Sequence, residues 1–140
     1  GMDASRIDSF LDATRVFGRE APVYLLGVND ISTDLHQRMR GAFEFFLEGV
    51  ERALGNTEYL AGDELTIADI AFVCDFSQFM RERLMRDGLD AASLPLVSEG
   101  SEADYPRAFA HLQRLVQQAE FAQYLELYTE HFLGQNTDKA

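Results

Sequence analysis

Cysteine is nearly absent from the sequence: Cys74 is the only one in 140 residues, so no intrachain disulfide can form. Long apolar runs are missing too, since none approaches the roughly 20 residues that a membrane-spanning helix needs. Residues 1–30 lack the basic start and the apolar stretch of a secretory signal. We therefore expect a cytoplasmic protein that does not enter a membrane.

Basic residues are also scarce. The 12 Lys and Arg residues stand against 24 Asp and Glu residues, which gives a formal net charge of -12. This charge would repel a phosphate backbone, so we do not expect nucleic acid as a partner. A composition with 46% hydrophobic and 26% charged residues is typical of one globular domain.

The two ends of the chain differ in character from its middle. Gly1 and Met2 look like the scar of a cleavage before a start codon, although a longer protein cut next to an internal methionine would look the same. We assign residues 1–4 to this scar and a linker. Residues 5–134 form one helical domain in this interpretation, and residues 135–140 form a disordered tail.

Apolar residues recur at helical spacing through most of the domain, which predicts an all-α fold, a helical bundle. Residues 23–28 form a short apolar run after Pro22, and we favour a bent helix there because no second strand is available to pair with it. Residues 89–104 are rich in Ser and acidic groups and predict a solvated connector. The stretches with helical spacing are 6–17, 32–54, 66 to about 86, 106–116 and 121–132.

The start of the helix at residue 66 carries the most informative local pattern. Thr66 as N-cap can accept from the N–H of Asp69, and the Asp69 carboxylate can accept from the N–H of Thr66. Leu65 before the cap and Ile70 in the first turn stand where a hydrophobic staple would lie. We therefore interpret Asp69 as a structural residue rather than a catalytic carboxylate.

These residues carry a family resemblance. The run Tyr59-Leu60-Ala61-Gly62-Asp63, followed by Leu65-Thr66-Ile67-Ala68-Asp69, resembles the N-capping-box and staple motif in the C-terminal domain of cytosolic glutathione transferases. Ile7-Asp8-Ser9-Phe10-Leu11 looks like the start of the first helix of that domain. Tyr105-Pro106-Arg107-Ala108-Phe109 looks like its later Tyr-Pro helix, so the resemblance covers about residues 5–132.

The resemblance implies a role in a two-domain enzyme that conjugates glutathione, its co-substrate, to a hydrophobic electrophile. In the family, a thioredoxin-like domain holds and activates glutathione, and this sequence has no βαβ pattern to supply one. We therefore expect the chain alone to be inactive and to carry no catalytic residue. The partners implied are an N-terminal thioredoxin-like domain and a second copy in a homodimer.

The resemblance also places candidate site residues on the first helix. Asp12 falls where some members contact glutathione, and Val16, Phe17, Arg19 and Glu20 fall near the pocket for the electrophile. A solvated helix face is the competing interpretation for these positions. The first and central helices of the family pack against the thioredoxin-like domain. Apolar residues there, such as Val16, Phe17 and Val73, are therefore expected to be less buried than their character suggests.

The remaining candidate groups favour structural roles. Cys74 could form a mixed disulfide with glutathione, but its apolar sequence neighbours predict a buried thiol with a raised pKa. The histidines lie far apart in sequence, which predicts no metal site. We assign a set of aromatic residues to the core rather than to a ligand site. The histidines are His36, His111 and His131, and the aromatic residues are Phe43, Phe45, Phe46, Tyr124, Tyr128 and Phe132.

Two other functions stay open from the sequence alone. Similar helical domains attached to translation factors and aminoacyl-tRNA synthetases bind proteins, so a free-standing interaction module is the alternative. A small stand-alone enzyme ranks last, because no nucleophile-base pair or metal cluster is visible in the sequence.

Overall fold

The computed structural model describes residues 4–27 and 31–118 of the chain. The predicted last helix over 121–132, the predicted tail, His131 and the aromatic residues Tyr124, Tyr128 and Phe132 lie outside these residues. The described part is helical and contains no strand, only an isolated bridge between Tyr59 and Gly62, which confirms the all-α prediction. The α-helices are α1 (Ala4–Leu26), α2 (Thr33–Leu54), α3 (Ile67–Phe79), α4 (Arg86–Ala91), α5 (Ser101–Asp104) and α6 (Pro106–Val116), with a 3-10 helix η1 (Met80–Met85) after α3.

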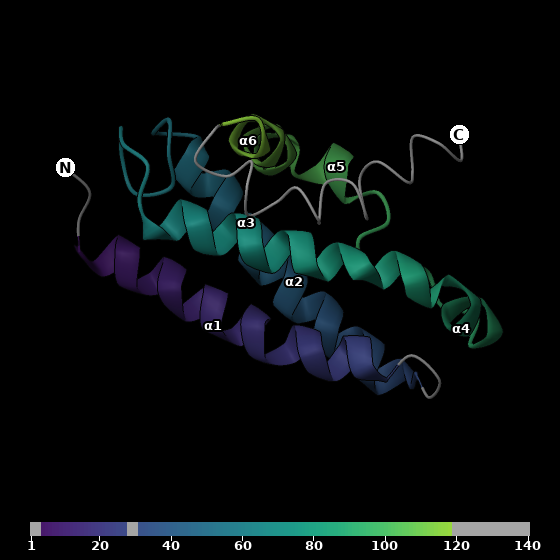
Figure 1. Ribbon diagram of the computed structural model, residues 1–140. Coiled ribbons are helices and arrows are strands. Elements are labelled where there is room, and N and C mark those ends of the chain that lie inside the picture. The colour runs from purple at the N-terminus through teal and green to yellow at the C-terminus, as the bar shows by residue number, and fades with distance from the viewer. Residues whose placement is uncertain (1–3, 28–30, 119–140) are drawn as a thin grey trace.

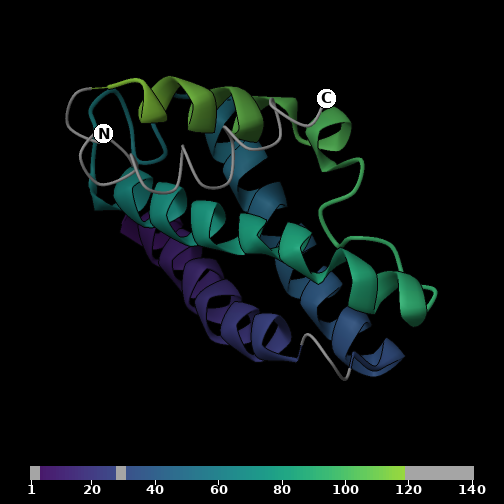
Figure 2. The same cartoon turned by 45° about the vertical axis from the view of Figure 1, so that its right-hand side comes forward.

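The three longest helices pack together into one bundle. Figure 1 shows α1 and α3 side by side, with α2 behind both, and α1 contacts each of the other two. In Figure 2, α6 lies across the top of the bundle, where it contacts α2 and α3. α3 thus lies between α1 on one side and α6 on the other.

Aromatic rings fill the centre of the bundle. Phe17 of α1 is fully buried, stacks on Phe46 of α2 at a ring distance of 4.5 Å and meets Phe79 of α3 edge-on at 5.3 Å. Such offset and edge contacts add to the burial of the rings themselves. The expectation that Phe17 and Val73 are less buried than their character suggests is therefore wrong, since both are fully buried by this chain alone. Val16 is partly buried against the same core.

One predicted core aromatic residue lies outside the core. Phe43 and Phe46 are buried, but 56% of the Phe45 surface is exposed. Successive helix positions are about 100° apart, so a residue between two buried neighbours can still point away from the core. The assignment of Phe45 to the core is therefore wrong.

The first helix continues into the apolar run 23–28, for which the sequence favoured a helix over a strand. Pro22 lies inside α1, and the helix extends to Leu26, so the helical interpretation of this run is confirmed over its described residues. Ser32 begins α2 as predicted, because its hydroxyl accepts from the N–H of Leu35 at 3.0 Å.

The central helix is shorter than predicted. α3 ends at Phe79, and the chain continues as the 3-10 helix η1 and then as α4. The tighter winding accompanies the complete burial of Glu82, whose polar contacts are described below. The connector predicted over 89–104 holds the end of α4 and the short helix α5, so it is more ordered than expected.

Candidate functional site

The N-terminus of α3 is built around the buried Asp69 carboxylate. Its Oδ2 atom accepts from the N–H of Thr66 at 2.9 Å, and both halves of the capping box are present. The Thr66 hydroxyl also accepts from the N–H of Ala68 at 3.3 Å. These contacts pair backbone donors of the first turn that would otherwise stay unsatisfied. Of the predicted staple residues, Leu65 packs against the core and 45% of Ile70 is exposed.

The same carboxylate joins two further segments. Its Oδ1 atom accepts from the N–H of Leu60 at 3.0 Å and lies 2.8 Å from Nε2 of His111 on α6. Burial opposes ionisation of Asp69, but the hydrogen bonds from His111, Leu60 and Thr66 outweigh it and hold its pKa below the ordinary value. The loop before α3 and the helix α6 are thus both hydrogen-bonded to the ionised Asp69 carboxylate.

The position of Arg114 fixes the protonation of His111. The Arg114 guanidinium lies 2.6 Å from Nδ1 of His111, and because arginine can only donate, Nδ1 must accept. The proton of the neutral imidazole is then on Nε2, where it is donated to Asp69. Both ring nitrogens are occupied, so His111 has no free lone pair with which to act as a general base. We interpret the Asp69–His111 pair as a structural link.

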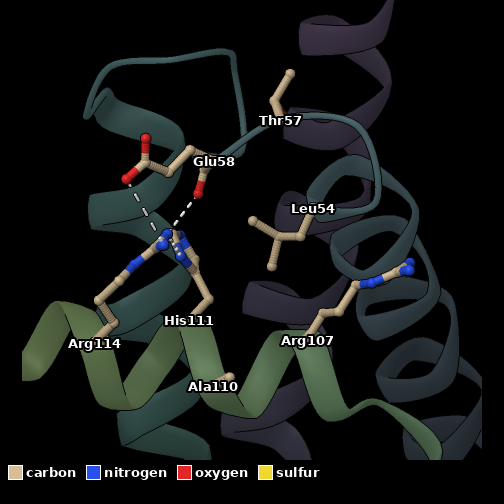
Figure 3. Close-up of a pocket in the computed structure, with 7 residues that line it drawn as sticks. All are labelled: Leu54, Thr57, Glu58, Arg107, Ala110, His111 and Arg114. Carbon is tan, nitrogen blue, oxygen red and sulfur yellow. Dashed lines mark hydrogen bonds and ion pairs between the residues drawn. The ribbon is translucent and has the colours of Figure 1, made fainter.

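A small cavity of about 280 Å³ opens beside this link. Figure 3 shows Arg114 bent toward His111 and Glu58, while the Arg107 side chain points to the opposite side of Leu54. Arg114 donates to the Glu58 backbone oxygen and lies over the Tyr59 ring, 5.2 Å from its centre. The two guanidinium groups therefore do not converge on one ligand position in this cavity.

A larger cavity of about 770 Å³ lies between η1 and α5. Its walls carry both charge signs, with Arg83 and Arg86 opposed by Glu99 and Glu102. Burial lowers the pKa of Arg83, and the nearby Glu102 and Glu82 charges oppose this change. Because the walls carry both charges, the cavity favours neither an anionic nor a cationic ligand.

The structure separates the candidate pocket residues of α1 into two groups. Asp12 and Arg19 are exposed, and Asp12 pairs with Arg15 at 3.4 Å. Glu20 is buried and forms two contacts with Arg38 of α2, at 2.8 and 2.9 Å. Glu20 and the buried Phe17 therefore hold α1 against α2 and do not line an open surface. Asp12, Arg19 and the partly buried Val16 stay accessible.

Cys74 differs from its prediction in one respect. The residue is exposed on α3, so the assignment to the core is wrong. Its pKa is nevertheless raised, first by partial desolvation and second by the charge of Asp75. A raised pKa favours the protonated thiol, so the exposed residue is a weak nucleophile near neutral pH.

A second buried carboxylate, Glu82, was missed by the sequence analysis. It accepts from the Tyr24 hydroxyl and the Val97 N–H at 2.6 Å each, and from the N–H and hydroxyl of Ser98 at 3.1 and 2.8 Å. Burial and the Glu82 charge raise the Tyr24 pKa far above its ordinary value, so Tyr24 stays a hydrogen-bond donor. Nearby, Nε2 of His36 lies 2.7 Å from the Pro95 carbonyl oxygen, to which it donates.

None of these groups forms a metal cluster in the part of the chain that the structure describes. No set of three or more His, Cys, Asp or Glu side chains comes together there. Among the described helices, none combines the length and the apolar character needed to cross a bilayer.

Comparison with known families agrees with this architecture. The model of the glutathione S-transferase C-terminal domain matches residues 33–114. The chain belongs to this family. Searches among curated proteins and solved structures each returned no match.

The family match extends from α2 to α6. It includes both Asp69 and His111, which link α3 to α6 in this glutathione S-transferase C-terminal domain. The match begins after α1. All the residues that were expected near glutathione or the electrophile lie on α1. The match therefore supports the helical frame and does not reach those candidate residues.

Proposed function

We propose that this chain is the helical domain of a glutathione transferase, in which it forms one wall of the pocket for a hydrophobic electrophile. The observation that carries the proposal is a pair of exposed apolar side chains at the start of α3, in a member of this family. At the start of α3, 72% of Ile67 and 45% of Ile70 are exposed. The two residues are three positions apart, so their side chains adjoin on one side of the helix, and adjoining exposed apolar residues can mark a surface that another domain covers.

The partner proposed for this face is a thioredoxin-like domain of the same protein. The resemblance assigns glutathione binding and activation mainly to that domain, so glutathione would be a co-substrate of the complete enzyme. The exposed Asp12 carboxylate has the charge to meet the amine of glutathione, with Arg19 and Val16 nearer the electrophile. A cytosolic location and a homodimer complete this proposal.

The test combines the chain with a thioredoxin-like domain taken from a glutathione transferase. We expect the isolated chain neither to bind glutathione in titration calorimetry nor to conjugate it. We expect a complex with the added domain, and we expect Ile67→Asp with Ile70→Asp to abolish it. Phe45→Asp on α2 is the matched control and should leave this complex intact. Micromolar glutathione binding by the chain alone would contradict the proposal.

A specific observation favours the second candidate, a free-standing protein-binding module. Phe17 and Val73 are fully buried by this chain alone, so the bundle completes its aromatic core without another domain. A domain that needs its partner should bind a hydrophobic dye through Ile67 and Ile70, whereas a self-sufficient module should not. Dye fluorescence of the chain and of the Ile67→Asp, Ile70→Asp variant separates the two functions.

A further inference from the structure

The cavity between η1 and α5 lies apart from the surface proposed for the thioredoxin-like domain. That surface is at the start of α3, whereas η1 and α4 follow the other end of α3, as the path of the chain in Figure 1 shows. The cavity has a volume of about 770 Å³. Small-molecule sites typically have volumes of about 300–1,000 Å³. The cavity is therefore a separate place with room for a ligand of moderate size.

The charged side chains that line this cavity are unpaired in the described part of the chain. Arg83 is half-buried and forms no hydrogen bond and no ion pair there, although the charges of Glu102 and Glu82 lie near it. The side chains of Arg86 and Glu99 are exposed and likewise form no ion pair with a described residue. A partly desolvated guanidinium without a partner is unfavourable, and a carboxylate from a ligand would offset this cost.

Apolar side chains form another part of the lining. Met80, Leu96 and Phe109 all border the cavity. Met80 is buried, and the Phe109 ring meets the Phe76 ring edge-on at 5.2 Å. Apolar walls with a small number of charged groups are typical of ligand sites. The ligand that matches this lining has an apolar body and charged ends.

The buried Glu82 carboxylate holds two walls of the cavity together. It accepts from the N–H of Ser98 at 3.1 Å and from the hydroxyl of Ser98 at 2.8 Å, and Ser98 itself lines the cavity. The Ser101 hydroxyl donates to the Ser98 carbonyl oxygen at 2.6 Å. These bonds connect the wall that carries the glutamates to η1, which carries Arg83. Walls that are fixed in advance lower the cost of ordering the site when a ligand binds.

We propose that this cavity binds a short apolar peptide by its free termini, with the carboxylate at the two arginines and the ammonium at the two glutamates. A guanidinium group matches the shape of a carboxylate and can donate two hydrogen bonds to it. The arginines come from η1 and α4, and the glutamates come from residues 99–102, so the two charges belong at opposite ends of the ligand. The apolar side chains of the peptide then contact Leu96 and Phe109.

Ligands with a single charge match the cavity less well. An anion would meet the arginines but would be repelled by Glu99 and Glu102, and by the formal net charge of -12 of the whole chain. A cation would leave Arg83 unpaired. A protein that inserted only its C-terminus would supply the carboxylate without the ammonium. Both charges of a short peptide find an opposite charge, and the peptide as a whole is neutral.

The test is an NMR titration of the isotope-labelled 140-residue chain with the tripeptide alanyl-phenylalanyl-alanine. We expect the peptide with free termini to bind and to shift the amide signals of Gly100 and Ala103, which line the cavity. The N-acetylated and the C-amidated forms of the same peptide should each bind at least tenfold more weakly, because each lacks one of the two charges.

Two substitutions assign the ends of the peptide. Arg83→Gln should lower the affinity for the free peptide to that of the parent for the C-amidated form. Glu102→Gln should lower it to that of the parent for the N-acetylated form. The matched controls are Arg40→Gln on α2 and Glu64→Gln before α3, which remove the same charges from other exposed positions and should leave the affinity unchanged.

Three results would each overturn the proposal: no binding of the free peptide at millimolar concentration, equal affinity for the three forms, or shifts confined to the start of α3. The role proposed in a glutathione transferase depends on none of them, because it is tested by the added thioredoxin-like domain and by substitutions of Ile67 and Ile70. Failure of one proposal therefore leaves the other standing.

Discussion

Asp69 and His111 are separated by 42 positions in the sequence and joined by a contact of 2.8 Å in the interior. Both side chains are almost completely excluded from solvent. Because Arg114 donates to the other ring nitrogen of His111, the pair consists of an ionised carboxylate and a neutral imidazole. The start of α3 and the middle of α6 are therefore held together by a directional contact as well as by apolar packing.

Removing the Asp69 carboxylate should destabilise the fold strongly. Asp69→Ala leaves the N–H groups of Leu60 and Thr66 and the Nε2–H of His111 without their acceptor. We expect a loss of about 3 kcal/mol or more in the free energy of unfolding. Asp69→Asn should cost less, because the amide oxygen still accepts. Urea denaturation checks this order, and the exposed Asp63→Ala is the control; equal stability of the Asp69→Ala variant and the parent would contradict it.

The lowered pKa of Asp69 predicts an acid-sensitive stability. The unfolded state has an ordinary aspartate pKa of about 3.9, so below that pH it binds a proton that the native state still excludes. The contribution of Asp69 is therefore complete well above pH 4 and is lost as the pH falls toward the lower native pKa. Denaturation midpoints from pH 7 to pH 2 should fall more steeply for the parent than for Asp69→Asn. Parallel curves would contradict the prediction.

Even an isosteric substitution of Glu82 should destabilise the fold. In Glu82→Gln, the amide NH₂ replaces one of two oxygens that each accept two hydrogen bonds, so donors would face donors. We expect a loss of about 3 kcal/mol or more, because a buried network fails when one member is unsatisfied. Tyr24→Phe removes one donor and should cost about 1–3 kcal/mol. Thermal unfolding should therefore rank the parent first, Tyr24→Phe second and Glu82→Gln last.

Cys74 should react in the native protein but slowly near neutral pH. Its exposure allows a maleimide or a disulfide reagent to reach the thiol, and its raised pKa keeps the reactive thiolate scarce. Asp75→Asn removes one cause of the raised pKa and should speed labelling at pH 7. A native protein that reacts only after addition of denaturant would contradict the exposed position of Cys74.

The helical frame was predictable because helix periodicity and capping are local properties. Ser32 and Thr66 cap helices through residues within three positions, so the sequence alone contains the pattern. Burial on α3 was harder to predict, because apolar residues surround this helix. Phe72, Val73 and Phe76 occupy one arc of the helix, and Cys74 points out of that arc although it stands between them.

The long-range polar contacts left no signal that the sequence analysis used. Glu82 lies in the run Met80-Arg81-Glu82-Arg83, which reads as a solvated surface, yet it is fully buried. Its partners Tyr24 and Val97 come from 58 and 15 positions away. His111 likewise stands in an ordinary amphipathic helix. Such residues become visible only when the packing of the helices is known.

The Glu82 contacts allow the segment between Glu82 and Val97 to vary in length during evolution. Glu82 binds Val97 and Ser98, so the segment 83–96, which includes α4, is closed at its base by hydrogen bonds. Its tip includes the exposed Ser93, which has a positive φ of 58°. Lengthening a loop that is already closed costs only about 0.6 kcal/mol for each doubling of its length. Insertions at this tip should therefore be tolerated, and it is the place in the described chain where we expect new surface features to be gained with least effect on the aromatic core.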